Sequence, residues 1–227
     1  TDYNKLNLNG SLEYRFGTNG AIIANGGYAT LTSAVLSGIG TLQAKDFGYR
    51  YAQLRFQLGD FFAQAYANQN NAGDSYVYGF DIDGKEGNDI VVDNGLAYNV
   101  QAQYNVTTWE GRQSFIFGAD MELTRPDTEG TILDDANGRA DIDEYGGYIQ
   151  STTDLSHKFA LTLAGRADYN NLTEDVTFSP RAALVFKPVN GHSVRLSYNR
   201  AFKSPTTNSH FLNIPAGIIP GTDILIR

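Results

Sequence analysis

Acidic side chains crowd two stretches of the chain, where they could hold a hard cation. The first stretch contains Asp81, Asp83, Glu86 and Asp89. The second contains Asp134, Asp135, Asp141 and Asp143. Ca²⁺ takes about six to eight oxygen ligands, which carboxylate-rich loops can supply. Neither stretch completes the Asp-x-Asp-x-Asp-Gly pattern with a distal Glu, so the alternative interpretation is solvated surface charge that repels anions.

Residues with catalytic potential form no known catalytic motif. The segment from Gly79 to Glu86 approaches a phosphate-binding P-loop, but Glu86 replaces the final Ser or Thr and two aspartates would repel phosphate. The three histidines, His157, His192 and His210, are scattered and show no metal-ligand spacing. No Gly-x-Ser-x-Gly or His-Glu-x-x-His motif occurs. The sequence therefore predicts no enzyme, and no cofactor apart from a loop-bound Ca²⁺.

The strongest pattern in the chain is the alternation of apolar and polar residues over segments of about ten residues. From Leu96 to Val106, every second residue is apolar or aromatic and those between are mostly Asn or Gln, and Phe159 to Tyr169 alternates in the same way. Side chains of a strand alternate between two faces, so each segment has one apolar and one polar face. A tilted strand of about ten residues also crosses the hydrocarbon core of a bilayer. The sequence therefore predicts an all-β, up-and-down antiparallel transmembrane β-barrel segment.

About ten strands are expected, joined by connections that alternate between short and long. The expected strands are Lys5–Phe16, Ala21–Thr32, Phe47–Leu58, Phe61–Asn68, Leu96–Val106, Gln113–Leu123, Tyr145–Thr153, Lys158–Tyr169, Ser179–Phe186 and Ser193–Ala201. The long connections are Ser33–Asp46, Gln69–Gly95 and Thr124–Glu144, with Asn170–Phe178 as a shorter member. In outer-membrane barrels the short turns are periplasmic and the long loops extracellular.

Composition and charge argue against two classes of protein, those that span a membrane with helices and those that bind nucleic acid. The chain is 41% hydrophobic with a mean hydropathy of -0.32, and it has no apolar run long enough for a transmembrane helix. The segments 69–93 and 124–142 carry net charges of -5 and -3, which account for the whole formal charge of -8. Binding to nucleic acid needs a basic surface, so the acidic balance argues against such a partner.

A set of charged and amide residues lies in the polar phase of the expected strands. Its members are Glu122, Arg166, Asp168, Arg181, Arg195 and Asn199. A charge on the lipid face costs about 2 to 4 kcal/mol at the bilayer midplane, so we expect these side chains to face the lumen. There they would pair with one another, contact a plug or contact cargo. Arg166 and Asp168, two residues apart, are placed to pair with each other or with neighbouring strands.

Four motifs in the last third of the chain resemble the mid-barrel of TonB-dependent outer-membrane receptors. The motifs are Glu144–Gln150 (EYGGYIQ), Gly165–Tyr169 (GRADY), Phe178–Pro188 (FSPRAALVFKP) and Arg195–Pro205 (RLSYNRAFKSP). Their order and spacing carry the resemblance over about 144–205. Before that region, only the succession of hairpins is similar to the family.

The resemblance implies active uptake of a scarce nutrient, such as a ferric siderophore, haem, cobalamin or a glycan, through a plugged barrel of about 22 strands. The partners it implies are outer-membrane lipid, the cargo, and the TonB energy-coupling protein acting through the plug. The implied location is the outer membrane of a Gram-negative bacterium. Neither a plug nor a terminal strand with an aromatic end is visible, so residues 1–227 are expected to be an internal part of one barrel domain.

Two other functions stay open at this point. One is a barrel without energised transport, such as a passive porin or an adhesin anchor, and the presence of an upstream plug would decide against it. The other is a soluble β-sandwich that binds carbohydrate. A sandwich buries its apolar faces between two sheets and would dissolve without detergent, whereas a barrel wall would not.

Overall fold

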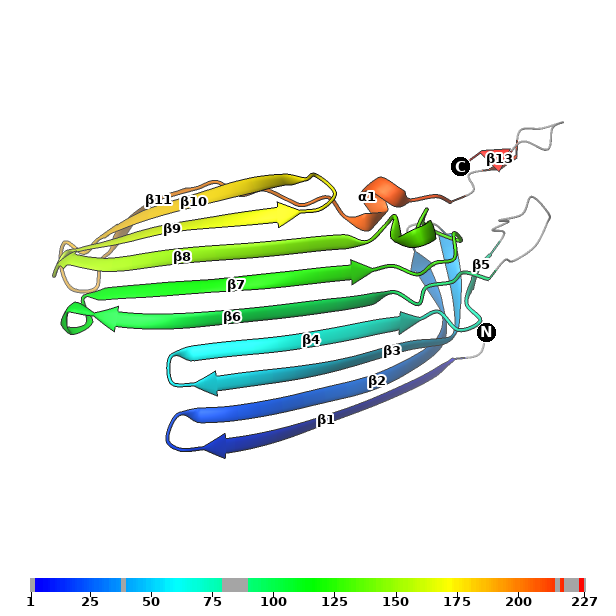
Figure 1. The fold of residues 1–227 in the computed structure, drawn as a ribbon, viewed down its shortest axis with the longest axis horizontal. Coiled ribbons are helices and arrows are strands. Elements are labelled where there is room, and N and C mark those ends of the chain that lie inside the picture. Colours follow the sequence, from blue (N-terminus) through cyan, green and yellow to red (C-terminus); the bar gives the residue numbers. More distant parts are fainter. Residues whose placement is uncertain (1–2, 38–39, 79–89, 215–216, 219–224, 227) are drawn as a thin grey trace.

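The structure, a computed structural model, describes residues 3–37, 40–78, 90–214, 217–218 and 225–226. Most of these residues form one curved antiparallel sheet, in which strands adjacent in the chain are adjacent in space (Figure 1). The sheet is 11-stranded; β5 (Tyr76–Val77) pairs only with β3, and the other ten strands form a continuous wall. The wall is open, with β1 and β11 at its edges. The predicted up-and-down segment of about ten strands, an incomplete barrel, is confirmed.

Each expected strand overlaps one strand of the wall. The wall strands are β1 (Asn4–Phe16), β2 (Gly20–Ser37), β3 (Gly40–Leu58), β4 (Phe61–Asn71), β6 (Leu96–Thr108), β7 (Gln113–Arg125), β8 (Ile142–Ser156), β9 (Phe159–Asn170), β10 (Asp175–Phe186) and β11 (Val194–Asn199). The smaller elements are η1 (Trp109–Gly111), η2 (Ala136–Gly138), α1 (Thr207–Phe211), β12 (Gly217–Ile218) and β13 (Leu225–Ile226). Among the described helices, none is long and apolar enough to cross a membrane.

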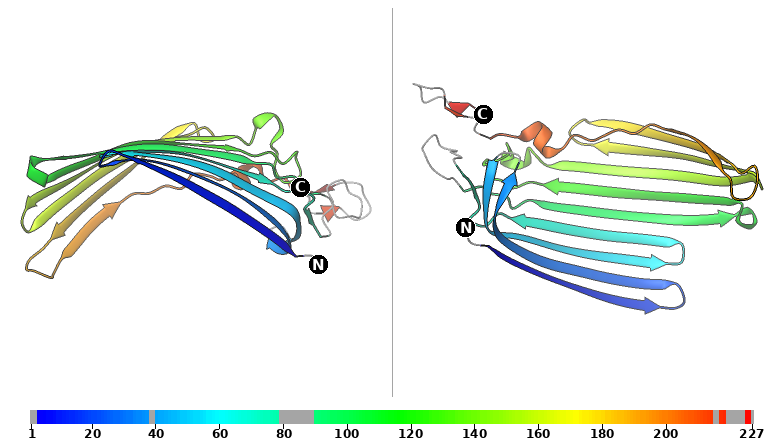
Figure 2. Two further views of the ribbon diagram at one scale, coloured as in Figure 1. Left: turned by 90° about the horizontal axis from the view of Figure 1, so that it is seen from below. Right: turned by 180° about the vertical axis from the view of Figure 1, so that it is seen from behind.

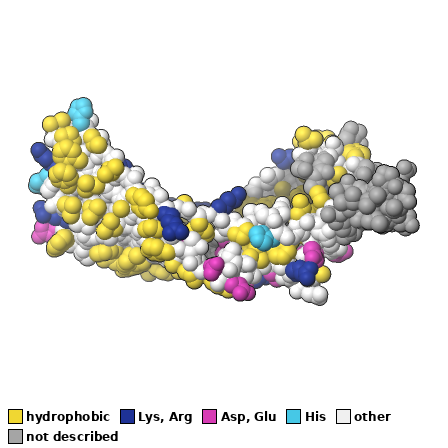
Figure 3. All heavy atoms as spheres, turned by 90° about the horizontal axis from the view of Figure 1, so that it is seen from above, with side chains coloured by type: hydrophobic (Ala, Val, Ile, Leu, Met, Phe, Trp, Pro, Cys, Tyr) yellow, Lys and Arg dark blue, Asp and Glu magenta, His cyan; other side chains and the backbone are white. Residues whose placement is uncertain are grey.

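The wall has one apolar and one polar face, as the alternation predicts. It curves into a trough (Figure 2), and hydrophobic side chains gather along the convex side (Figure 3). Val100 in β6 and Leu163 in β9 belong to the apolar face and are 41% and 50% exposed. No described element packs over this face as a second sheet would, which excludes a β-sandwich. An apolar surface of this extent marks a face that is covered by lipid, detergent or another protein, and lipid is the cover that a barrel wall requires.

The connection from Ser33 to Asp46, expected to be a loop, is instead mostly strand. β2 and β3 continue their pairing from Ser33↔Ala44 to Ser37↔Gly40, so they form a ribbon beyond the wall. A β-bulge separates the ribbon from the wall: Thr32 faces both Lys45 and Asp46, and Asp46 has φ 55°. The hydroxyl of Thr32 accepts a hydrogen bond from the Asp46 backbone N–H at 3.1 Å. The bulge bends the ribbon away from the plane of the wall.

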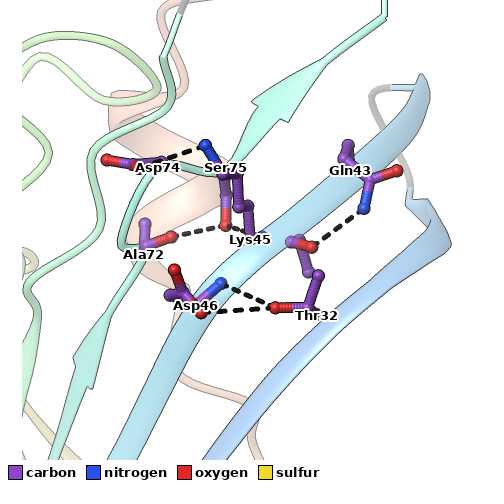
Figure 4. A network of polar contacts seen from close by, with 8 residues as sticks. Thr32, Gln43, Lys45, Asp46, Ala72, Asp74 and Ser75 are labelled. Atoms are coloured by element: carbon purple, nitrogen blue, oxygen red, sulfur yellow. Dashed lines mark hydrogen bonds and ion pairs between the residues drawn. The ribbon is translucent and has the colours of Figure 1, made fainter. Parts of the chain in front are cut away.

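The connection after β4 is tied to this ribbon by the polar contacts drawn in Figure 4. Ser75, which is only 1% exposed, accepts a hydrogen bond from the Lys45 backbone N–H at 3.0 Å and donates one to the Ala72 carbonyl. Lys45 also forms an ion pair with Asp74 at 3.3 Å. At position 73 a Cβ would lie 2.5 Å from the Lys45 carbonyl oxygen and φ is +58°, so only glycine allows this approach.

The connections pack together above the wall as a loop layer, which we define as residues 33–37, 40–46, 72–78, 90–94, 127–135 and 211–214. Val77 and Val91 are 2% and 4% exposed, and the partly buried residues packed against them are Leu42, Ile132 and Ile214. These residues come from several segments that are far apart in the chain. A single-layer wall cannot enclose side chains, so the hydrophobic core of the described residues lies largely in this layer rather than in the barrel.

Two further boundaries differ from expectation. The connection expected over Asn170–Phe178 is only a four-residue turn, because β9 ends at Asn170 and β10 begins at Asp175. Pro180, expected near the start of its strand, therefore lies well inside β10 and pairs with Gly165 of β9. Proline lacks the N–H that a central strand needs for its ladder, so its tolerance here has a specific reason, given below.

The face assignment predicts unequal costs for arginine on adjacent residues of β9. In the complete barrel, Leu163→Arg places a charge in the hydrocarbon layer and should lower the free energy of unfolding by about 2 to 4 kcal/mol. Thr162→Arg places the same charge on the polar face and should cost less than about 1 kcal/mol. Among the described residues, the only side-chain hydrogen bond lost there joins the Thr162 hydroxyl to the Thr152 hydroxyl at 3.3 Å. Urea titrations of folding into lipid vesicles would measure both, and equal costs would refute the assignment.

Candidate functional site

The polar face carries a cavity of about 560 Å³ at the end of the wall where the long connections lie. Its wall side is built from β7, β8, β9 and β10, and includes three of the residues predicted to face the lumen, Glu122, Arg166 and Asp168. Its other side is the segment Arg200–Pro205, which follows β11. We call this cavity the upper-lumen pocket.

The other three predicted residues do not line this pocket. Arg181, Arg195 and Asn199 share the polar phase of β10 and β11, and Arg181 pairs in register with Asn199. Arg195 and Asn199 are exposed, and their strand, β11, lies at the edge of the sheet. The alternation predicts their face but contains no information about their height along the barrel axis.

The centre of the pocket wall is an ion-pair network around Arg166. Its guanidinium donates two parallel hydrogen bonds to Asp120 on β7, from Nη1 at 2.6 Å and from Nη2 at 2.7 Å. Nε donates a third to Asp168 at 2.7 Å. The guanidinium carbon also lies 5.9 Å from the ring centre of Tyr148. Bidentate arginine–carboxylate pairs combine strength with fixed geometry, so this network should be rigid.

Arg166 and Asp120 lie on strands that are not neighbours, and β8 runs between them. In register, Asp120 faces Gly146 of β8, and Gly146 faces Asp168 of β9. The arginine side chain crosses β8 directly over Gly146, where an added Cβ would clash with Nη2 and lie 2.7 Å from the guanidinium carbon. The absence of a side chain at position 146 is therefore what permits this contact across three strands.

The same arrangement occurs at two other places on the polar face. Tyr148 crosses Gly118 of β7 and donates a hydrogen bond to Gln103 of β6 at 2.7 Å. Tyr51 of β3 crosses Gly27 of β2 and donates one to Asn9 of β1 at 3.1 Å. We call these three contacts glycine crossings. Sequence reasoning missed Asp120 and all three crossings, although Asp120 shares the polar phase with Glu122 and a glycine lies in each crossed strand.

Two oxygen atoms of the pocket wall are left unpaired. Oδ2 of Asp168 and Oγ of Ser179 are buried without a hydrogen-bond partner among the described residues. Buried polar atoms of this kind are costly to leave unpaired, so water or a ligand is expected to satisfy them. Glu144, in contrast, accepts a hydrogen bond from the buried Asn170 amide at 3.0 Å. The guanidinium of Arg166 is already occupied by two carboxylates.

Of the two acidic stretches considered as Ca²⁺ ligands, the structure describes only the second. Asp81, Asp83, Glu86 and Asp89 lie outside the described residues. In the second acidic stretch, Asp134 pairs with Arg139, and both Asp141 and Asp143 pair with Arg125. Asp135 instead accepts hydrogen bonds from the backbone N–H groups of Thr128 and Gly130. Across the part of the chain that the structure describes, no three acidic or histidine side chains converge as a metal site would require.

The crossing over Gly146 predicts different outcomes for two adjacent glycines. Gly146→Ala should displace Arg166, leave Asp120 and Asp168 unpaired, and lower the free energy of unfolding by about 1 to 3 kcal/mol. Gly147→Ala is the matched control, because its Cβ would meet only the Gly118 carbonyl oxygen at 4.0 Å. It should be neutral or stabilise the strand by up to about 1 kcal/mol. Urea unfolding of the complete barrel would measure both, and similar losses would contradict the crossing.

Comparison with known proteins agrees with the fold and with the two-faced wall. No curated protein matches the chain. The family described as "TonB dependent receptor-like, beta-barrel" matches residues 1–223, which extends well beyond the motifs near 144–205. Proteins of this family are receptors of the Gram-negative outer membrane rather than enzymes. The chain belongs to the TonB-dependent receptor β-barrel family.

Proposed function

We propose that residues 1–227 are an internal part of the barrel domain of an outer-membrane receptor that imports a scarce nutrient, driven by the TonB system. A plug and further strands would come from the remainder of the same protein. The family match supports this proposal, as does a wall whose apolar face suits lipid and whose polar face suits a lumen. The observation that carries it furthest is the upper-lumen pocket, a cavity lined mostly by charged and polar residues at the end of the wall where the long connections lie.

In this proposal the pocket contributes to cargo binding. Glu122 and Asp175 line it and form no side-chain hydrogen bond with another described residue, so their carboxylates are available to a ligand. The unpartnered oxygens of Asp168 and Ser179 lie in the same wall. Arg166 holds the wall in place rather than binding cargo, because Asp120 and Asp168 already occupy its guanidinium. The cargo would be a small molecule or glycan of the kind such receptors import, including ferric siderophores, haem and cobalamin.

Uptake measurements on the complete receptor test this role. Glu122→Gln and Asp175→Asn together should reduce nutrient-limited growth or uptake of labelled cargo about tenfold, since each removes a charged hydrogen-bond partner. Arg195→Gln is the matched control, because it changes a charge on the same face outside the pocket. It should leave uptake within about twofold of wild type. Uptake that persists without the TonB protein would instead indicate a passive barrel.

The proposed orientation places the loop layer outside the cell and the short turns in the periplasm. Asp127 is exposed in the β7–β8 connection, and Asn190 is exposed in the short β10–β11 connection. In the complete receptor, a cysteine that replaces Asp127 should react with a membrane-impermeant thiol reagent on intact cells. A cysteine that replaces Asn190 should react only after the outer membrane is breached. The reverse pattern would invert the orientation.

A further inference from the structure

The segment Arg200–Pro205, which we call the strap, leaves the wall at the end of β11 and forms the inner side of the upper-lumen pocket. β10 and β11 pair in register from Phe186↔Val194 to Arg181↔Asn199, and the paired region ends there. The following residues belong to no strand until the chain reaches α1. The strap thus faces the pocket wall formed by β7, β8, β9 and β10 instead of extending the sheet.

Pro180 accounts for the place where the strap separates. In an antiparallel ladder the N–H and C=O of one residue point to the same neighbouring strand. The Pro180 carbonyl accepts a hydrogen bond from the Arg200 N–H at 3.1 Å, so its missing N–H is on the side of β11. The pairing of β10 with β9 therefore loses no backbone hydrogen bond. The pairing of β10 with the chain beyond Asn199 lacks the N–H donor that Pro180 does not have. Proline is tolerated inside β10 because the donor it lacks points away from β9, to the side on which the pairing with β11 ends.

The strap and the wall opposite it carry complementary charges. Arg200 and Lys203 line the pocket from the strap, and neither forms an ion pair with another described residue. The wall presents Glu122, Glu144 and Asp175, which are likewise free of ion pairs with described cations. These charges share one cavity without direct contact. Attraction at such separations is weakened by salt, since the screening length falls from about 10 Å at about 0.1 M to about 3 Å at about 1 M.

We propose that the strap closes one side of the upper-lumen pocket in the cargo-free receptor as an internal, electrostatically held competitor for cargo. Its cations attract the carboxylates of the wall across the cavity until a ligand displaces the strap. The charge complementarity supports a specific position of the strap against the wall. The break in pairing at Pro180 means that few backbone hydrogen bonds hold the strap there, so it is weakly bound. The seating of the strap does not depend on transport, whereas its role as a competitor for cargo rests on the proposed function.

Accessibility of one introduced thiol in the pocket tests the seating without any cargo. The chain contains no cysteine, so Thr177→Cys on β10 places a single thiol on the pocket wall. In the complete receptor in isolated outer membranes, a neutral polyethylene-glycol maleimide should modify this pocket thiol slowly at about 0.1 M salt. Adding Arg200→Glu and Lys203→Glu should raise the rate about tenfold, because the strap is then repelled. Raising the salt to about 1 M should accelerate the parent but not the charge-reversed protein.

Two further variants serve as controls. The first moves the strap without changing any charge, and the second reports whether the barrel as a whole is altered. Pro180→Thr restores the missing N–H, extends the pairing of β11 along the wall, and should also raise the rate at the pocket thiol without changing any charge. Gln64→Cys, made on β4 outside the pocket in a protein that keeps Thr177, should react at a rate that changes less than about twofold in every strap variant.

The deciding measurement is the rate at the pocket thiol. Rates that stay within about twofold of the parent in both the charge-reversed and the Pro180→Thr proteins would overturn the proposal. A changed rate at the Gln64→Cys control would mean that the strap variants alter the whole barrel, which would also count against it. Uptake does not enter this measurement, so its failure and the failure of the transport proposal are distinguishable.

Discussion

The whole structure depends on backbone hydrogen bonds between strands that follow one another in the chain. Within a bilayer no water is present to satisfy an N–H or C=O group, so every strand inside the wall must be paired on both sides. Pairing in turn fixes the two faces, because side chains alternate along every strand. Leu163 and Arg166 belong to the same strand and meet opposite environments for this reason. The polar pocket, the apolar belt and the loop layer are all consequences of this single sheet.

A one-layer wall has no interior in which hydrophobic side chains could pack, so burial of such side chains stabilises other parts of the structure. Most of the buried hydrophobic residues, such as Val77, Val91 and Leu133, lie in the connections. On the wall itself, specific contacts come from polar side chains on the lumen face, above all the bidentate pair of Arg166 and Asp120. The receptor therefore combines a wall stabilised by lipid and hydrogen bonds with a small conventional core above it. Loss of one need not unfold the other.

The strand positions and their faces were predictable from the sequence, because alternation with period two is visible in most strands of the wall. The height of a residue along the barrel was not, so Arg181 and Asn199 were grouped with Arg166 although they lie outside its pocket. The segment Ser33–Asp46 was expected to be a long connection, yet most of it continues the ladder as a ribbon. Asp120 was missed because its partner lies two strands away. Contacts of that range depend on register, which a single sequence does not reveal.

The glycine crossings have a consequence for how such a wall is assembled. A contact between neighbouring strands needs only two of them, but Arg166 reaches Asp120 only when β7, β8 and β9 are all aligned with Gly146 between them. A slip of one residue turns each side chain of a strand to the opposite face, which would send the arginine into lipid and put a side chain in its path. Each crossing therefore forms only when its three strands are paired in the native register. A hairpin paired in another register lacks this contact, so the stabilisation it provides favours the native register over a slipped one.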